Sequence, residues 1–292
     1  MFKGSIVAIV TPFHNGKVDE KKLRGLIEFQ IKNGTSGIVP CGTTGESATL
    51  TFDEHEKVIE VTIDQVDKRI PVIAGTGSNS TEEAIMLTRQ AASAGADASL
   101  QVSPYYNRPT QAGLYRHFKA IAQSVKIPII LYNIAGRTGV NIEPETIANL
   151  ARDCKNIVAV KEASASLDQM SRIKALCPPS FQLISGDDSL TLPVMSIGGT
   201  GIISVVANIV PSDVANLVSA FEKGNIKKAQ ILHYKLLPLI KACFVETNPI
   251  PVKTAMGLLG LCDPDLRLPM CEMSQDNLGK LKKALKDYGL LK

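Results

Sequence analysis

The sequence contains no apolar run of the length that a membrane-spanning helix needs. It also carries little net charge. The formal value is +4, the isoelectric point is about 8.6, and the lysines and arginines are scattered without interleaved aromatic residues. A nucleic-acid-binding surface is therefore not expected. The N-terminus offers only a short apolar stretch, Ser5–Val10, before Thr11-Pro12, which predicts a strand meeting a turn rather than a signal peptide.

Paired cysteines and clustered histidines are also missing. The cysteines form no CxxC pair and no compact framework, which predicts reduced thiols and a cytoplasmic location. The histidines show no HxxxH or His–carboxylate spacing, so we expect no metal site. An enzyme of this sequence that forms carbon–carbon bonds would need an amine to stabilise its carbanion equivalent. The dispersed residues are Cys41, Cys154, Cys177, Cys243, Cys262 and Cys271, and His14, His55, His117 and His233.

Short β-rich apolar runs alternate with stretches of helical periodicity through most of the 292-residue chain. This alternation predicts βαβ units and a parallel sheet, and the number of units fits a closed (β/α)8 TIM barrel. An open doubly wound sheet is less favoured, because the turn Thr11–His14 lacks the Gly-rich dinucleotide fingerprint. The predicted strands are Ser5–Val10, Gly37–Val39, Pro71–Ala74, Ala98–Val102, Pro128–Tyr132, Ile157–Lys161, Phe181–Ser185 and Gly201–Val205, and the predicted helices include Glu20–Lys32, Asp53–Val66, Thr81–Ala94 and Leu114–Val125.

The last quarter of the sequence shows helical patterns and no further strands. We therefore expect a catalytic barrel over residues 1–223 and a C-terminal helical appendage over residues 224–292. Within the barrel, Asp53 and either Ser80 or Thr81 are predicted to cap helices. The predicted C-terminal helices are Ile226–Ala242, Ile250–Leu261 and Ser274–Tyr288, the last with a solvated face that carries Lys280, Lys282, Lys283 and Lys286.

Polar, glycine-rich and aromatic residues follow most of the predicted strands. The carboxyl ends of barrel strands build the active site, so we expect these segments to meet on one rim. The run Gly198–Gly201 precedes the eighth strand instead and is predicted to be a tight turn on the opposite rim. The segments on the first rim are Cys41–Glu46, Gly75–Asn79, Ser103–Asn107, Tyr132–Gly139, Lys161–Ser164 and Gly186–Asp188.

Lys161 closes the apolar run Ile157–Lys161, so its amine should emerge from the barrel interior. Desolvation disfavours the ammonium form, which lowers the pKa of a lysine and frees its lone pair to attack a carbonyl. The alternative is a structural lysine paired with a rim carboxylate. Glu162 is a poor candidate for that pairing, because adjacent residues on a strand point to opposite faces.

Three further features on the same rim suit this chemistry. Tyr132 ends the neighbouring strand and can shuttle a proton, although a packing role at the rim is the alternative. The turn Gly42–Gly45 offers backbone N–H groups and two hydroxyls to an anion, or is a purely structural glycine turn. Arg137 can grip a carboxylate with two parallel hydrogen bonds, or is a loop arginine at the surface.

Taken together and in this order, the rim motifs closely resemble the dihydrodipicolinate synthase (4-hydroxy-tetrahydrodipicolinate synthase) family of the N-acetylneuraminate lyase superfamily. The resemblance covers essentially the whole chain. It implies condensation of pyruvate with L-aspartate 4-semialdehyde on the route to diaminopimelate and lysine, without a cofactor. The motifs that carry it are Gly42–Glu46, Tyr105–Pro109, Tyr132-Asn133, Arg137–Gly139, Lys161–Ala163, Ser185–Asp188 and Asn248–Lys253.

The resemblance implies a role for each motif residue. Lys161 would form a Schiff base with pyruvate, which makes the methyl group acidic enough to give an enamine. Tyr132 would pass protons through Thr43 to Tyr106, which in this family comes from the partner across a tight dimer interface. The substrate-binding residues would be Thr44 for the pyruvate carboxylate, Arg137 for the aldehyde's carboxylate, and Gly186 and Ile203 for the pocket wall.

The family resemblance also implies a lysine-effector site and a tetramer built from two tight dimers. Two positions depart from the family pattern. Phe52 stands where a histidine is common, and Ala135 stands where proline is frequent, which should loosen the loop that carries Arg137 slightly. The possible effector residues are Ala48, His55, Asn79, Glu83 and Tyr105.

Two rival functions remain open at this point. A lyase for N-acetylneuraminate or a 2-keto-3-deoxy sugar acid would use the same lysine. Arg137 argues against it, because a sugar pocket favours neutral hydrogen-bonding groups. A barrel that only senses pyruvate or lysine is the other rival, and the presence of both Lys161 and Tyr132 argues against it.

Overall fold

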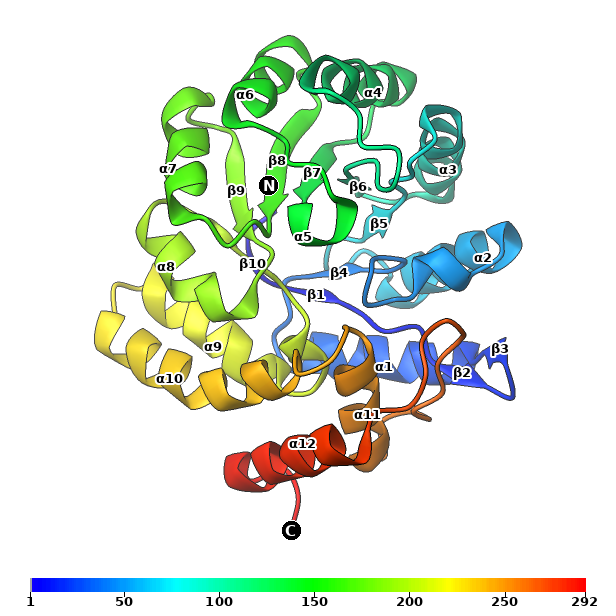
Figure 1. Cartoon of the computed structure of the whole chain (residues 1–292), viewed down its shortest axis with the longest axis vertical. Coiled ribbons are helices and arrows are strands. Elements are labelled where there is room, and N and C mark those ends of the chain that lie inside the picture. The colour runs from blue at the N-terminus through cyan, green and yellow to red at the C-terminus, as the bar shows by residue number, and fades with distance from the viewer. Residues whose placement is uncertain (1) are drawn as a thin grey trace.

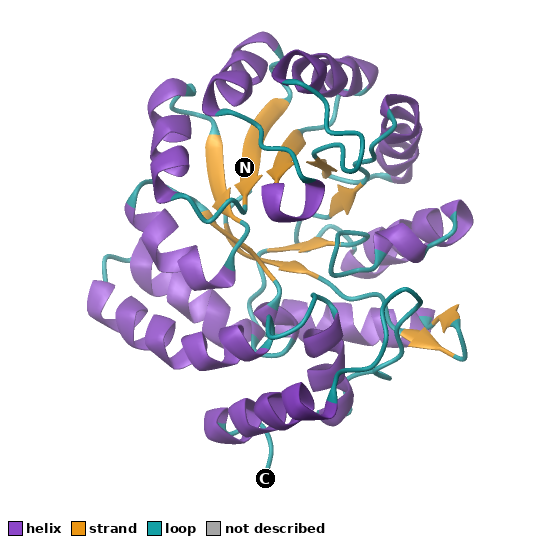
Figure 2. Cartoon of the chain, viewed as in Figure 1, coloured by secondary structure: helices purple, strands orange, loops and turns teal. Residues whose placement is uncertain are grey.

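The computed structural model describes residues 2–292 and shows a closed barrel of eight parallel strands (Figure 1). Neighbouring strands pair in the order β4-β1-β10-β9-β8-β7-β6-β5, and a parallel bridge between Ile38 and Val72 closes the series. Helices surround these strands in Figure 2, so the predicted TIM barrel is confirmed. The barrel strands are β1 (Gly4–Ala8), β4 (Gly37–Val39), β5 (Ile73–Gly75), β6 (Ala98–Val102), β7 (Ile129–Asn133), β8 (Ile157–Glu162), β9 (Gln182–Ser185) and β10 (Gly201–Ser204).

Alternation along the strands divides the core into an inner and an outer layer. On β1, Ile6 belongs to the cluster inside the barrel, whereas Val7 belongs to the cluster between strands and helices. Phe2 joins the inner cluster at the N-terminal end, where its backbone N–H donates to the Oε1 of Gln182 (3.0 Å). The inner cluster extends to Tyr132 at the other end. The barrel is therefore a packed core whose last layer reaches the candidate site.

The helices of the barrel begin at recognisable caps. Ser80 caps α3 as predicted, because its hydroxyl accepts from the backbone N–H of Glu83 (3.4 Å). The prediction for Asp53 was wrong. Thr51 caps α2 through a reciprocal capping box with Glu54, and Asp53 lies in the first turn. The helices are α1 (Glu20–Lys32), α2 (Phe52–Val66), α3 (Thr81–Ala94), α4 (Gln111–Ser124), α5 (Ala135–Thr138), α6 (Pro144–Asp153), α7 (Leu167–Leu176), α8 (Thr191–Ser196) and α9 (Pro211–Glu222).

A small hairpin outside the barrel was not predicted. Its strands β2 (Phe13–His14) and β3 (Lys17–Val18) pair antiparallel. They are joined by Asn15 and Gly16, whose φ angles of 52° and 76° suit a tight hairpin turn. The predicted ends of the barrel strands differ from the observed ones by at most two residues. Three 3₁₀ turns complete the barrel region, namely η1 (Ser47–Thr49), η2 (Asp188–Leu190) and η3 (Val206–Asn208).

Three helices follow the barrel, α10 (Ile226–Ala242), α11 (Ile250–Leu258) and α12 (Gln275–Tyr288), and α12 lies at the far edge of the molecule in Figure 1. Ser274 caps α12 rather than beginning it. Gly260, with a φ of 69°, follows the end of α11, so this helix stops before the predicted Leu261. As predicted, Lys280, Lys282, Lys283 and Lys286 are exposed on α12.

The predicted division after residue 223 falls between α9 and α10 and stays a prediction, and residue 1 of the predicted barrel lies outside the described residues. Over residues 2–292, the structure contains no helix with both the length and the apolar character needed to span a bilayer.

Candidate active site

Lys161 and Tyr132 lie side by side at the C-terminal end of the barrel. They are register partners on β8 and β7, and the Nζ of Lys161 is 4.2 Å from the centroid of the Tyr132 ring. Lys161 is only 6% exposed. The predicted placement of this amine at the mouth of the barrel interior is therefore confirmed.

The pKa of Lys161 is lowered to about 7, because the effect of burial, together with that of the positive charge of Arg137, outweighs the opposing effect of Asp188. A lysine with a pKa near 7 is neutral in roughly half of the molecules at neutral pH, whereas an ordinary lysine is almost fully protonated. The structure thus supplies a reactive amine without needing a base to deprotonate it completely.

Glu162 faces away from Lys161, as the strand alternation predicts. Its fully buried carboxylate accepts hydrogen bonds from the Nδ2 of Asn133 (3.0 Å), the Nε2 of Gln169 (3.0 Å) and the backbone N–H of Ser164 (2.8 Å). No ion pair of Lys161 is found among residues 2–292. Glu162 is therefore not the rim carboxylate that would hold Lys161 in a structural ion pair.

The Tyr132 phenol is buried beside the turn that was predicted to bind an anion. Burial raises the pKa of Tyr132, whereas the charge of Arg137 and a hydrogen bond with the Thr43 hydroxyl lower it. The Thr43 hydroxyl is thus close enough to the Tyr132 phenol to affect its pKa within one chain, and the proton relay that the family resemblance implies stays a prediction. A phenol that is hydrogen-bonded and close to an amine can accept and return a proton.

The turn that is predicted to bind an anion, Gly42–Gly45, is closed by two backbone hydrogen bonds, from the N–H of Gly45 to the carbonyl of Gly42 (3.1 Å) and from the N–H of Glu46 to that of Thr43 (3.1 Å). Its approach to the barrel is tight, because a Cβ on Gly75 would lie 2.3 Å from the carbonyl oxygen of Cys41. Close packing of this kind fixes the direction of the threonine side chains. Thr44 is buried, and Thr43 is half-buried at the mouth.

Arg137 lies in α5 on the same rim and lines a surface cavity of about 610 Å³. Its Nη2 donates to the backbone carbonyl of Asn248 (3.1 Å), and no ion pair of Arg137 is found among residues 2–292. The guanidinium therefore keeps donors free for an incoming carboxylate. The cavity is lined by Tyr105, Tyr106, Arg108, Gly136, Arg137, Thr138 and Gly139.

Gly186 lies beside Lys161, and Ile203 lies inside the barrel. A Cβ on Gly186 would come within 3.2 Å of the Cε of Lys161 and 2.8 Å of the Cβ of Ala163, so only glycine leaves the lysine its room. Ile203 is 1% exposed on β10 and belongs to the inner cluster. Gly186 therefore borders Lys161, whereas the role of Ile203 in the pocket wall stays a prediction.

Tyr106 is not part of the cluster within one chain. It is 91% exposed and has a φ of 71°, and no hydrogen bond of its side chain to Thr43 is found among the described residues. A left-handed conformation at a bulky residue is uncommon. The loop thus projects the phenol outward from the rim.

Asp188 and Asn248 also belong to the site but were not predicted from the sequence, although both lie in recognised motifs. Asp188 is buried and accepts from the hydroxyl of Ser204 and the backbone N–H of Val205 (2.9 Å). Burial raises its pKa to about 6, and those hydrogen bonds keep it from rising further. Its position after a strand end gave a hint of this role, whereas the contact of Asn248 with the rim spans too many residues to be anticipated.

Four of the five possible effector residues come together beside this rim. The Nδ2 of Asn79 donates to the carbonyl of Tyr105 (3.3 Å), and burial raises the pKa of Tyr105, with the charge of Glu83 acting in the same direction. Burial lowers the pKa of His55, whose Nε2 lies 2.9 Å from the carbonyl of Gly75. Ala48 is exposed in η1.

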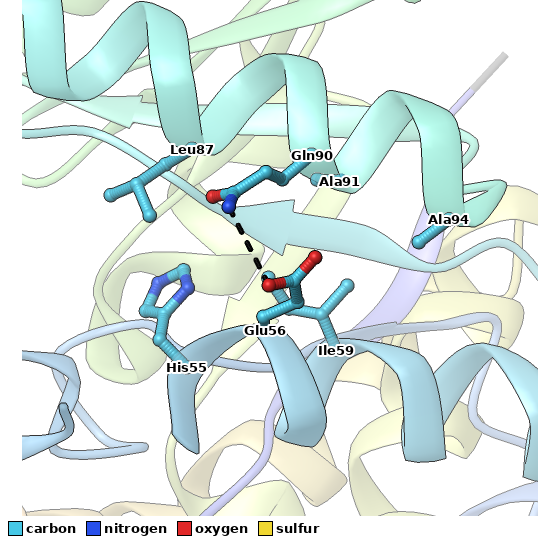
Figure 3. A pocket seen from close by; sticks show the side chains of 7 residues that line it. All are labelled: His55, Glu56, Ile59, Leu87, Gln90, Ala91 and Ala94. Carbon is cyan, nitrogen blue, oxygen red and sulfur yellow. Dashed lines mark hydrogen bonds between the residues drawn. The ribbon is translucent and has the colours of Figure 1, made fainter. Parts of the chain in front are cut away.

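His55 also borders a narrow groove between α2 and α3 (Figure 3). In this view the side chain of Gln90 spans the groove to Glu56 (3.5 Å). The groove leaves no space for even a water-sized ligand. A lysine molecule therefore does not fit in this groove.

Comparison with known proteins is consistent with this geometry. Residues 1–288 match the Dihydrodipicolinate synthetase family. The chain belongs to this family. It is 61% identical over 291 residues to the 4-hydroxy-tetrahydrodipicolinate synthase of Syntrophus aciditrophicus, with 100% of both chains covered.

Solved structures of family members agree closely with the fold. The dihydrodipicolinate synthase from Aquifex aeolicus is 54% identical, with a TM-score of 0.98 and 99% of both chains covered. The enzyme from Cyanidioschyzon merolae, solved with lysine bound, is 44% identical, with a TM-score of 0.96 and 99% of both chains covered. Among residues 2–292, no group of three or more His, Cys, Asp or Glu residues is placed to hold a metal ion.

Proposed function

We propose that this chain is a class I aldolase-type lyase that condenses pyruvate with L-aspartate 4-semialdehyde to 4-hydroxy-tetrahydrodipicolinate, in lysine and diaminopimelate biosynthesis. The observation that carries the proposal is the buried amine of Lys161, which lies beside Tyr132 and whose pKa of about 7 leaves it neutral in roughly half of the molecules at neutral pH. Membership of the family supplies the pair of substrates. No cofactor is required, because the protonated imine that Lys161 forms with pyruvate accepts the electrons released by the methyl group.

Groups at the site can account for each bond and each proton transfer of the condensation. The amine of Lys161 adds to the pyruvate ketone, and loss of water leaves a protonated imine. Removal of a methyl proton then gives an enamine, whose carbon attacks the aldehyde of the second substrate. The amine of that substrate finally displaces Lys161 by cyclisation. Tyr132, with Thr43 beside it, carries the protons between these steps.

The two carboxylates are assigned to opposite sides of the amine. The turn with Thr43 and Thr44 holds the pyruvate carboxylate through its N–H and hydroxyl groups. Arg137, with donors free in a cavity, holds the carboxylate of the aldehyde. Gly186 and Ile203 complete the pocket wall. A sugar-acid lyase would have less use for a free arginine in this position.

Trapping with borohydride tests the mechanism directly. Wild-type protein treated with pyruvate and borohydride should gain one pyruvyl unit irreversibly, because reduction fixes the imine. Lys161→Ala should gain none, while Lys235→Ala, which removes a half-exposed lysine of α10, should behave as wild type. Intact mass without any gain in the wild-type chain would refute the proposal. Cleavage of a sugar acid without condensation of the semialdehyde would favour the rival lyase.

Assembly into a homotetramer of two tight dimers follows from the same proposal. Tyr106 projects outward at the rim, where the partner's site would receive it to complete the proton relay. Sedimentation of the intact protein should give a tetramer. Tyr106→Phe should lower kcat with little change in the sedimentation coefficient, because only the hydroxyl is removed.

L-Lysine is proposed as an effector that binds where His55, Asn79, Glu83 and Tyr105 gather. The relative from Cyanidioschyzon merolae was solved with lysine bound, and a carboxylate such as Glu83 suits an ammonium group. A cytoplasmic location is proposed with this biosynthetic role. Inhibition assays with L-lysine, using D-lysine as the control, test the effector site.

A further inference from the structure

A buried ion pair joins the anion-binding turn to the C-terminal helical region. The Oε1 of Glu46 lies 2.6 Å from the Nζ of Lys253, and the two side chains are 2% and 0% exposed. The second oxygen of Glu46 accepts from the backbone N–H of Arg267 (3.2 Å). Both carboxylate oxygens therefore hold the end of the turn against residues that lie more than 200 positions further along the chain.

The backbone at Glu46 needs such an anchor. Its φ of 55° and ψ of 36° are left-handed, a conformation that side-chain-bearing residues seldom adopt. Such conformations persist where the surrounding structure holds them. The N–H of Glu46 also closes the turn onto the carbonyl of Thr43, so the direction of this turn depends directly on how Glu46 is held.

The same C-terminal segment holds the other end of the turn. The Nδ2 of Asn248 donates to the hydroxyl of Thr44 (3.0 Å), and the carbonyl of Asn248 accepts from Arg137 (3.1 Å). Asn248 and Lys253 are five residues apart at the start of α11. One short segment thus contacts both carboxylate-binding groups of the proposed site.

The groups around Lys253 favour its ion pair with Glu46 over other pairings. The ring of Phe13 covers the ammonium at 4.1 Å from its centroid. Arg267, the nearest competing cation, is engaged by both oxygens of Glu54 at 2.6 Å each. Burial lowers the pKa of Lys253, and the carboxylate of Glu46 opposes this. The pair is therefore isolated from solvent and from exchange of partners.

We propose that Glu46 and Lys253 are positioning residues for the pyruvate carboxylate, because their ion pair fixes the turn that carries Thr43 and Thr44. This inference rests on the proposed function, which assigns the turn to that carboxylate. Neither residue touches substrate. The C-terminal helical region is thereby a working part of the active site.

Lys253→Met tests the proposal, because it keeps the unbranched apolar stem of the side chain and removes its charge. The KM for pyruvate should rise about tenfold, since small displacements of a binding group cost one to two orders of magnitude. The kcat at saturating pyruvate and the KM for the semialdehyde should stay within about twofold, as expected when binding of one substrate is weakened equally in the ground state and the transition state.

Lys283→Met is the matched control. It makes the same substitution in the C-terminal helical region, where Lys283 pairs with Asp287 on the exposed side of α12, and it does not contact the turn, so its KM for pyruvate should equal that of the wild type. Should Lys253→Met fail to fold, because Glu46 is left as a buried unpaired charge, the double variant E46Q/K253M removes both charges and should keep a raised KM.

An unchanged KM for pyruvate in Lys253→Met and E46Q/K253M, or an equal rise in Lys283→Met, would overturn the positioning role. Loss of kcat without a change in KM would overturn it as well. The proposed function is tested separately by borohydride trapping in the wild type. A trapped wild-type adduct together with an unchanged KM would leave the proposed function intact and remove only this inference.

Discussion

Replacing Lys161 by methionine is expected to stabilise the folded chain while abolishing pyruvate capture. Burial lowers the pKa of Lys161 from 10.5 to about 7. In the pH range between these values the unfolded chain binds a proton that the folded chain does not. The energetic cost of burying this lysine is therefore fully present below pH 7, and it vanishes as the pH rises through 10.5.

The size of the effect follows from the two pKa values. At about 1.4 kcal/mol for each pH unit between them, the cost is about 5 kcal/mol below pH 7 and about 4 kcal/mol at pH 7. Asp188 loses a favourable neighbour in the variant, which offsets part of the gain. We expect Lys161→Met to raise the free energy of unfolding by about 2–4 kcal/mol at pH 7, and by about 1 kcal/mol at pH 9.5.

Urea unfolding of both proteins at pH 7 and pH 9.5 measures this difference, because the midpoint and slope give the free energy of unfolding in water. Borohydride trapping of the same samples checks that capture is lost. A variant that is no more stable than the wild type at pH 7 would refute the reasoning. So would a stability gain that is as large at pH 9.5 as at pH 7.

Three further outcomes are expected. The rate of pyruvate capture by the wild type should fall about tenfold per pH unit below 7 and level off above about 8, because only the neutral amine of Lys161 reacts. Borohydride trapping that is stopped at successive times measures this rate. A rate that is constant from pH 5 to 7 would contradict the assigned pKa. Arg137→Ala should raise the KM for the semialdehyde about tenfold or more and leave pyruvate trapping possible, with equal loss of both as the contrary result. Gly186→Ala should lower kcat/KM about tenfold or more, because the new methyl group lies 2.8 Å from the Cβ of Ala163 and crowds Lys161, and circular dichroism should show an intact fold. Wild-type activity in that variant would show that the wall is not close-packed.

The barrel and its central residues could be predicted because the evidence for them is local. Lys161 ends an apolar run, and strand alternation then fixes its direction and that of Glu162. The cap of α2 could also have been predicted, since Thr51 and Glu54 have the spacing of a capping box. Asp53 was chosen instead because aspartate is itself a common N-cap residue. The hairpin at Asn15-Gly16 was missed because strands of two residues carry no alternation to detect.

The remaining parts of the site depend on contacts that local patterns do not contain. Glu46 and Lys253 meet across 207 positions, and Asn248 reaches Thr44 across 204. Asp188 was part of a recognised motif, but its effect on Lys161 requires the two to be buried in one pocket. Such pairings depend on how the barrel closes and on how α11 packs against it. The spacing of residues along the sequence predicts neither of these two features.

The opposed side chains at the end of β8 have a consequence for folding. A slip of this strand by one residue would turn the carboxylate of Glu162 into the substrate pocket and push the ammonium of Lys161 among the amides of Asn133 and Gln169. Those amides would then lose their acceptor, and an unpaired cation would lie beneath the helices, which is costly. Lys161 and Glu162 therefore also specify the register of β8 in the folded barrel.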